Sequence, residues 1–172
     1  MKSALLLIDL QNDYFPGYSF PLWNSEVVVE RTVKLIERAK RAGVDIIHIQ
    51  HVADPSLGLA PFFNRGTEGV MIRKEIMDAA PDGYIVEKSY ADSFIKTGLE
   101  ELLTKLGSEN LYVCGMMTQN CVTHTAISKH AEKYKVKIIQ DCSTTVSEML
   151  HLIALAAVST RAELINSDQL EF

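Results

Sequence analysis

Short apolar runs alternate along the chain with longer segments of helical spacing, and this alternation restricts the chain to few folds. The apolar runs predict six strands, over residues 4–8, 44–49, 84–87, 111–114, 136–140 and 162–165. The segments between them predict helices over residues 24–42, 73–79, 93–106 and 147–160, and another that follows Thr118 and ends near residue 134. Apolar strands separated by helices imply an α/β fold, with a parallel sheet covered on both faces.

Length, charge and cysteine content exclude several classes of protein. A chain of 172 residues suits one domain, so a single domain over residues 1–172 is expected. The net charge is −5 and no basic cluster occurs, so nucleic acid is not expected as a partner. No apolar stretch is long enough for a membrane span or a signal peptide. Three cysteines suit neither a disulfide framework nor a zinc site, which predicts a reducing, cytoplasmic setting.

The segment between the second and third strands interrupts the alternation. Residues 52–70 contain two prolines and three glycines and therefore predict a long loop. Phe62 and Phe63 lie within it. They are candidates for substrate contact if the loop folds over a site, and packing in the core or in a subunit interface is an equal alternative.

Three strands end next to residues that can carry chemistry together. Asp9 follows the first strand, Lys88 follows the third, and the fourth leads to Cys121. Ligands of open parallel sheets bind at the carboxyl ends of the strands, so these side chains are expected to meet. A carboxylate can take the proton of a thiol, and an ammonium group stabilises the thiolate. Each residue alone has a plainer interpretation, as a turn residue, a solvated lysine or a core cysteine.

Cys121 is placed by the stretch from Leu111 to Ala126. This stretch predicts a strand, a break at Gly115 and a helix with Cys121 in its first turn. The free N–H groups and the dipole at a helix start favour a thiolate, so Cys121 is a candidate nucleophile; a buried structural cysteine is the alternative. His124 lies one turn later on the same helix, so it ranks below Asp9 as the base.

Three motifs resemble those of one known superfamily. Residues 6–14, Leu-Leu-Ile-Asp-Leu-Gln-Asn-Asp-Tyr, match a hydrophobic strand followed by Asp-x-Gln-x-Asp and an aromatic residue. Lys88 has Phe94, Thr97 and Leu99 behind it at the superfamily's spacing, and residues 115–122 match Gly-x-x-Thr-x-x-Cys-Val. The chain thus resembles, over nearly its whole length, the isochorismatase-like cysteine hydrolases, which include nicotinamidases, N-carbamoylsarcosine amidohydrolases and isochorismatases.

The resemblance implies a fold, a catalytic triad and a quaternary state. The fold is a three-layer α/β/α sandwich, Rossmann-like, around a mainly parallel sheet of about six strands. The triad is Asp9 as general base, Lys88 as orienting cation and Cys121 as nucleophile. Backbone N–H groups of Met117 and Cys121 are candidates for the oxyanion hole, and a cis peptide bond is expected between Met116 and Met117. A homo-oligomer, dimer or tetramer, is also implied.

The chain departs from the superfamily where nicotinamidases bind their metal. The expected Asp-x-His after the second strand is replaced by His51 and Ala53, and Phe62 stands where a further histidine is expected. One imidazole with scattered acids does not make a metal site, so no metal and no other cofactor are expected. His51 is then expected to serve in strand-end packing or hydrogen bonding. Gln11 and Tyr14 are candidate substrate contacts, and Gln11 is also a candidate brace of the first loop.

These observations predict a metal-independent cysteine hydrolase. It would cleave a C–N bond of a small amide, ureido or carbamoyl compound through a thioester intermediate. An isochorismatase-type hydrolase of a vinyl ether, which would not need Cys121, is one alternative. A non-catalytic assembly module is the other. The expected partner is a small-molecule substrate.

Overall fold

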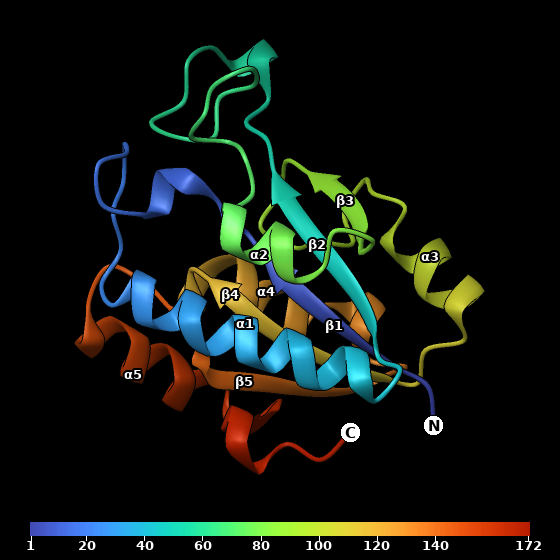
Figure 1. The fold of residues 1–172 in the computed structure, drawn as a ribbon. Helices are drawn as coiled ribbons and strands as arrows, with labels where there is room; N and C mark the ends of the chain where they lie inside the picture. Colours follow the sequence, from blue (N-terminus) through green and yellow to red (C-terminus); the bar gives the residue numbers. More distant parts are fainter.

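The computed structural model describes residues 1–172 around one sheet of six strands (Figure 1). The strands are β1 (Ser3–Ile8), β2 (Asp45–His51), β3 (Tyr84–Lys88), β4 (Asn110–Met116), β5 (Lys135–Thr144) and β6 (Glu163–Ile165). They lie in the order β3-β2-β1-β4-β5-β6, and every neighbouring pair is parallel. The predicted α/β fold and its six-stranded sheet are therefore confirmed.

Helices cover both faces of the sheet. They are α1 (Ser25–Arg41), α2 (Lys74–Ala79), α3 (Leu99–Leu106), α4 (Thr123–Ala126) and α5 (Glu148–Val158). The buried side chains of α1 and α2 belong to one apolar cluster, and those of α3, α4 and α5 belong to a second. Along β1, Leu5 and Leu7 enter the first cluster while Leu6 and Ile8 enter the second, as the two-residue period of a strand requires. The molecule thus has the expected three layers.

The predicted helix after Thr118 is wrong in its length. The chain forms one wide π-type turn over Thr118–Val122, continues as the short α4, and then forms a 3₁₀ turn over Lys129–Ala131. Ser128 ends the helix because its hydroxyl accepts a hydrogen bond from the N–H of His130, which competes with the helical pattern.

The predicted helix over 93–106 is wrong at its start. Helix α3 begins only at Leu99, and Ser93, its expected cap, is instead buried with its hydroxyl 2.8 Å from that of Thr125. Strand β5 is also longer than predicted, so Cys142 lies inside a strand rather than after one. Cys142 and Cys114 are both buried free thiols. The other elements begin and end close to the expected residues.

The order of the strands fixes one place in the molecule. The chain runs from β1 through β2 to β3 on one side and from β4 through β5 to β6 on the other. The switch point therefore lies between β1 and β4, at their carboxyl ends. Gly115 allows the two strands to approach there, because a Cβ at this residue would lie 2.0 Å from the carbonyl oxygen of Ile8.

The long loop between β2 and α2 extends past the same end of the sheet. Figure 1 shows it in teal and green beyond the tip of β2, while both termini lie at the opposite end. Its only regular piece is a 3₁₀ turn over Pro55–Leu57. No helix in the molecule combines the length and the apolar character that crossing a membrane requires.

Candidate active site

The ammonium group of Lys88 lies at the centre of a buried cluster. Its Nζ is 3.1 Å from Oδ2 of Asp9, 3.3 Å from Sγ of Cys121 and 2.8 Å from Nδ1 of His51. Asp9, Lys88 and Cys121 are each at most 3% exposed. The structure therefore brings together the three residues expected at the strand ends and adds His51 to them.

Each of these side chains is positioned by the end of a strand. Lys88 is the last residue of β3 and pairs in register with His51, the last residue of β2. Asp9 follows β1 directly, and its backbone turns into the left-handed region (φ 51°), which aspartate tolerates better than most residues. Its N–H still donates to the carbonyl of Ile49, so the turn is anchored to the sheet. Cys121 follows β4 within the π-type turn.

Charges within the cluster keep Lys88 protonated. Burial alone lowers the pKa of this lysine, but the neighbouring Asp9 and Cys121 outweigh burial and leave the pKa above its ordinary value. The side chains of Lys88 and Asp9 are both fully buried, so they form an ion pair shielded from water. Such a pair holds its geometry because separating the two groups would leave an unpaired charge in the protein interior.

The surroundings of Cys121 act on the pKa of its thiol in opposite directions. Burial first and then the carboxylate of Asp9 raise the pKa of this thiol well above its ordinary value, against the opposing effect of Lys88. The physical reason is that Cys121 is enclosed and lies in a wide turn, with no long helix behind it. A base must therefore remove the thiol proton.

Asp9 has the atom that such a base needs. Its Oδ2 accepts from Lys88, whereas its Oδ1 is buried without a hydrogen-bond partner. Buried polar atoms are seldom left unpaired, and one that is unpaired next to a thiol is available to accept its proton. The arrangement can thus activate a nucleophile by proton transfer over a short distance.

The turn between β4 and Cys121 contains the residues expected to form an oxyanion hole. The peptide bond between Met116 and Met117 is cis. The carbonyl of Met117 accepts from the N–H groups of Asn120 and Val122, at 3.0 and 3.4 Å. Met117 and Cys121 therefore stand at the two ends of one closed turn.

Of the two roles expected for Gln11, substrate contact and brace of the first loop, its hydrogen bonds are those of a brace. Its amide nitrogen donates to the carbonyls of His51 and Val70, each at 2.8 Å, and its amide oxygen accepts from the N–H of His51, also at 2.8 Å. The side chain is fully buried. The hydrogen bonds of its amide group all go to backbone atoms, so Gln11 ties the first loop to the end of β2.

Aromatic side chains form the wall beside the cluster. The ring of Tyr14 lies 4.6 Å from that of Phe63 and 5.4 Å from that of Phe62, and Phe63 lies 5.7 Å from the ring of His51. Burial, followed by the nearby Asp9 and Cys121, raises the pKa of Tyr14, so its hydroxyl stays protonated. Phe62 and Phe63 therefore lie over the site of their own chain.

Asp13 anchors the loop that carries these phenylalanines. Its Oδ2 accepts from the N–H of Phe63 at 2.7 Å, and the backbone at Gly69 lies so close that a Cβ there would be 2.1 Å from Oδ1 of Asp13. The motif Asp-x-Gln-x-Asp thus contributes one reactive carboxylate and two residues that hold the surrounding loops.

The other histidines lie outside the cluster. His124 is exposed, with Nδ1 2.8 Å from the carbonyl oxygen of Asn120, and His48 is buried with Nε2 2.8 Å from that of Ala80. His51 is a member of the site that was not predicted from the sequence. Its position at a strand end, opposite Lys88 in the next strand, is the signal that could have identified it.

The residues around the cluster do not fit a metal site like that of the nicotinamidases. Ligand atoms of Asp9, His51 and Cys121 do lie within 4.8 Å of one another. The ammonium of Lys88, however, is within hydrogen-bonding distance of all three, so a cation already occupies the centre of the donor set. Ala53 offers no ligand atom, and Phe62 packs among aromatic rings.

Comparisons with known proteins agree with this fold. Residues 3–169 match the family described as Isochorismatase domain. The uncharacterized isochorismatase family protein YddQ of Bacillus subtilis is 35% identical over 150 residues, which cover 87% of this chain and 82% of YddQ. Nicotinamidase 3 of Arabidopsis thaliana is 30% identical over 180 residues, which cover 98% of this chain and 86% of that protein.

Solved structures show the same architecture. The crystal structure of a putative isochorismatase hydrolase from Oleispira antarctica superimposes with a TM-score of 0.88 at 27% identity, over 98% of this chain and 95% of that one. The N-carbamoylsarcosine amidase of Thermoplasma acidophilum has a TM-score of 0.85 at 22% identity, with full coverage of both chains, and shows a shared fold.

Proposed function

This chain belongs to the isochorismatase family and is a hydrolase of that family, and from this premise we propose that it is a metal-independent cysteine amidohydrolase. Its substrate is a small amide, ureido or carbamoyl compound, whose C–N bond is cleaved through a thioester. The observation that carries the proposal is the contact of Lys88 with both Asp9 and Cys121 in a buried site.

Each step of the reaction uses one feature of the cluster. Oδ1 of Asp9, which has no other partner, takes the proton of Cys121, and the thiolate attacks the substrate carbonyl. The oxyanion accepts hydrogen bonds from the N–H groups of Met117 and Cys121. Protonated Asp9 returns the proton to the nitrogen, which leaves as ammonia or an amine. Asp9 then activates a water molecule that hydrolyses the thioester, releasing an acid and restoring the thiol.

The charges and the wall of the site favour small substrates without net charge. The carboxylate of Asp9 and the ammonium of Lys88 compensate each other, and no second charged side chain contacts them. The aromatic rings of Tyr14, Phe62 and Phe63 supply an apolar surface at one side. A compact amide with an apolar or aromatic acyl group matches both properties.

The test is ammonia release from a panel of small amide, ureido and carbamoyl compounds. We expect turnover by the natural chain, no turnover by Cys121→Ala, and a kcat lower by about 10²–10⁴-fold in Asp9→Asn, because general-base catalysis contributes that factor. Cys142→Ala is the matched control, since Cys142 lies inside β5 and outside the cluster, and it should remain active. Mass spectrometry of the quenched reaction should detect the acyl group on Cys121.

Two outcomes would overturn the proposal. Turnover that survives in Cys121→Ala but not in Asp9→Asn would identify a hydrolase that does not use a thioester, such as one acting on a vinyl ether. If the natural chain turns over no compound of the panel and no acyl group is found on Cys121, the fold would serve as a non-catalytic module.

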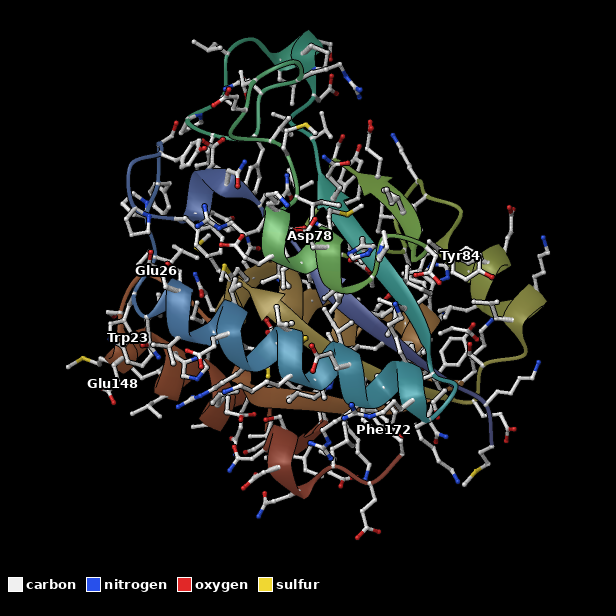
Figure 2. The ribbon with its side chains drawn as sticks, in the orientation of Figure 1. Trp23, Glu26, Asp78, Tyr84, Glu148 and Phe172 are labelled. Atoms are coloured by element: carbon white, nitrogen blue, oxygen red, sulfur yellow. The ribbon has the colours of Figure 1, made fainter.

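The proposal extends to assembly and to cellular setting. We propose a homo-oligomer, a dimer or a tetramer. It is supported by exposed apolar side chains on α5 and just before it: Val146, Met149, Leu152 and Ile153. Figure 2 shows Trp23 near Glu148 at the same end of the molecule, and the Trp23 ring lies 6.0 Å from that of His151 on α5. Three free thiols support a reducing, cytoplasmic setting. We propose neither nucleic acid nor a membrane as a partner.

A further inference from the structure

The backbone of His51, at the end of β2, is held by the side chain of Gln11. Both its N–H and its carbonyl are bound by the side chain of Gln11, each at 2.8 Å. Its ring lies 5.7 Å from that of Phe63. With its backbone fixed in this way, His51 places Nδ1 of its imidazole 2.8 Å from Nζ of Lys88.

The chemistry of the two groups decides which atom is the donor. A lysine ammonium has three N–H donors and no acceptor, so Nδ1 of His51 must accept and Nε2 must carry the proton of the neutral ring. Burial and the adjacent Lys88 charge lower the pKa of His51, in agreement with a neutral imidazole. The groups that face this ring are Lys88, Asp9, with Oδ2 3.9 Å from Nδ1, and Cys121.

The three contacts use all three N–H donors of the Lys88 ammonium group. Lys88 has three N–H bonds, and they meet Asp9, Cys121 and His51. Without the third acceptor, one N–H would be buried without a partner, and the ammonium would gain by turning away from the other two.

We propose that His51 is a positioning residue whose Nδ1 holds the ammonium of Lys88 between Asp9 and Cys121. The inference rests on the proposed function, because the position of Lys88 matters most if Cys121 is the nucleophile. His51 acts through Lys88 and needs no contact with the substrate.

The experiment compares two substitutions that differ in one property. His51→Asn retains an acceptor, the amide oxygen, near the place of Nδ1, whereas His51→Leu has a similar volume and no acceptor. The rate at which iodoacetamide alkylates Cys121 is measured from pH 6 to pH 10 by peptide mass spectrometry, and unfolding curves establish that both variants fold. Cys114 and Cys142 are internal references.

We expect His51→Leu to react about tenfold more slowly than the natural chain below pH 8, because a hydrogen bond to a charged group has about this effect. Its rate curve should move to higher pH by a corresponding amount. His51→Asn should retain a rate close to that of the natural chain. Equal rates in all three proteins, or equal losses in both variants, would overturn the assignment.

A second measurement separates this inference from the proposed function. If the natural chain turns over an amide on the panel but the quenched reaction leaves no acyl group on Cys121, the nucleophile assignment fails, whatever His51 does. The ¹⁵N chemical shifts of the His51 ring still test the contact itself, since the proposal requires the neutral tautomer with the proton on Nε2. A proton on Nδ1 would contradict it.

Discussion

At the scale of single residues, the site depends on pairing every buried charge. Lys88 and Asp9 compensate each other, and the remaining two N–H bonds of Lys88 meet Cys121 and His51. One atom, Oδ1 of Asp9, has no hydrogen-bond partner and is the base of the proposed reaction. For the histidines of the interior, burial lowers the pKa and favours the neutral ring.

Those histidines predict how stability depends on pH. Burial is the main cause that lowers the pKa of His48, His51 and His151 in the folded chain. Below a pH of about 6.5 the unfolded chain binds protons at these residues more readily than the folded chain. The free energy of unfolding should therefore fall as the pH drops from 7 toward 5.

Urea unfolding at pH 7.5, 6.5 and 5.5 measures this decline. His48→Gln is the matched variant, because glutamine keeps an N–H donor for the carbonyl of Ala80 but does not titrate. Its midpoint should change less with pH than that of the natural chain. A midpoint that stays constant or rises toward pH 5.5 in the natural chain would refute the prediction.

At the scale of elements, strands were predicted better than helix ends. The apolar runs around Leu6, Ile47 and Val113 are buried on both faces, so their pattern alone identifies them. The helix expected after Thr118 breaks into three short pieces because hydroxyl groups such as that of Ser128 bind the backbone locally. Local hydrogen bonds of this kind leave no periodic signal in the sequence.

The same limit applies to the site. Asp9, Lys88 and Cys121 could be predicted because each follows a strand, and strand ends in a parallel sheet converge. The contact of His51 with Lys88 could not, because it depends on the register between β2 and β3. The brace of the first loop was one of two roles expected for Gln11, but its partners His51 and Val70 depend on the path of the 52–70 loop. The burial of Cys121, which raises the pKa of its thiol, is likewise a property of the folded chain and leaves no signal in the sequence.

The junction of β1 and β4 gives a prediction for one backbone position. Gly115 has a φ of 125°, and a Cβ there would lie 2.0 Å from the carbonyl oxygen of Ile8. Gly115→Ala should therefore reduce the free energy of unfolding by more than about 3 kcal/mol, because strained backbone alone accounts for about 1–3 kcal/mol and the clash adds to it.

Gly17→Ala separates the two causes. Gly17 also has a positive φ, 89°, but nothing lies within 4 Å of its hypothetical Cβ, so it should lose only the part due to backbone strain. Denaturant unfolding of both variants gives the comparison. Equal losses at the two positions would show that the contact with Ile8 does not matter.

At the scale of the whole molecule, helix α5 has apolar side chains both on the face that packs in the core and on its exposed face. Inward-facing Leu155 and Val158 of α5 pack on the sheet, while Met149 is 73% exposed and Leu152 56% exposed. A helix that is apolar all round is ordinarily covered on all sides. A second copy of the chain would cover this surface.

Light scattering coupled to gel filtration tests that assembly. We expect the mass of a dimer or tetramer for the natural chain and a smaller mass for Leu152→Lys, which places a charge in the covered surface. Leu57→Lys is the control, because Leu57 is 86% exposed in the 52–70 loop, away from α5, and should not change the mass. A monomeric natural chain would contradict the proposed assembly.

The compensated charges of Asp9 and Lys88 have a consequence for how substrate arrives. A centre without net charge produces little field beyond the protein surface, so it does not attract neutral amides from a distance. Capture then depends on random encounter, and the second-order rate should be nearly the same in dilute buffer and in concentrated salt. The chain's overall charge of −5 acts only on charged molecules, and it turns anions away most effectively when salt is scarce.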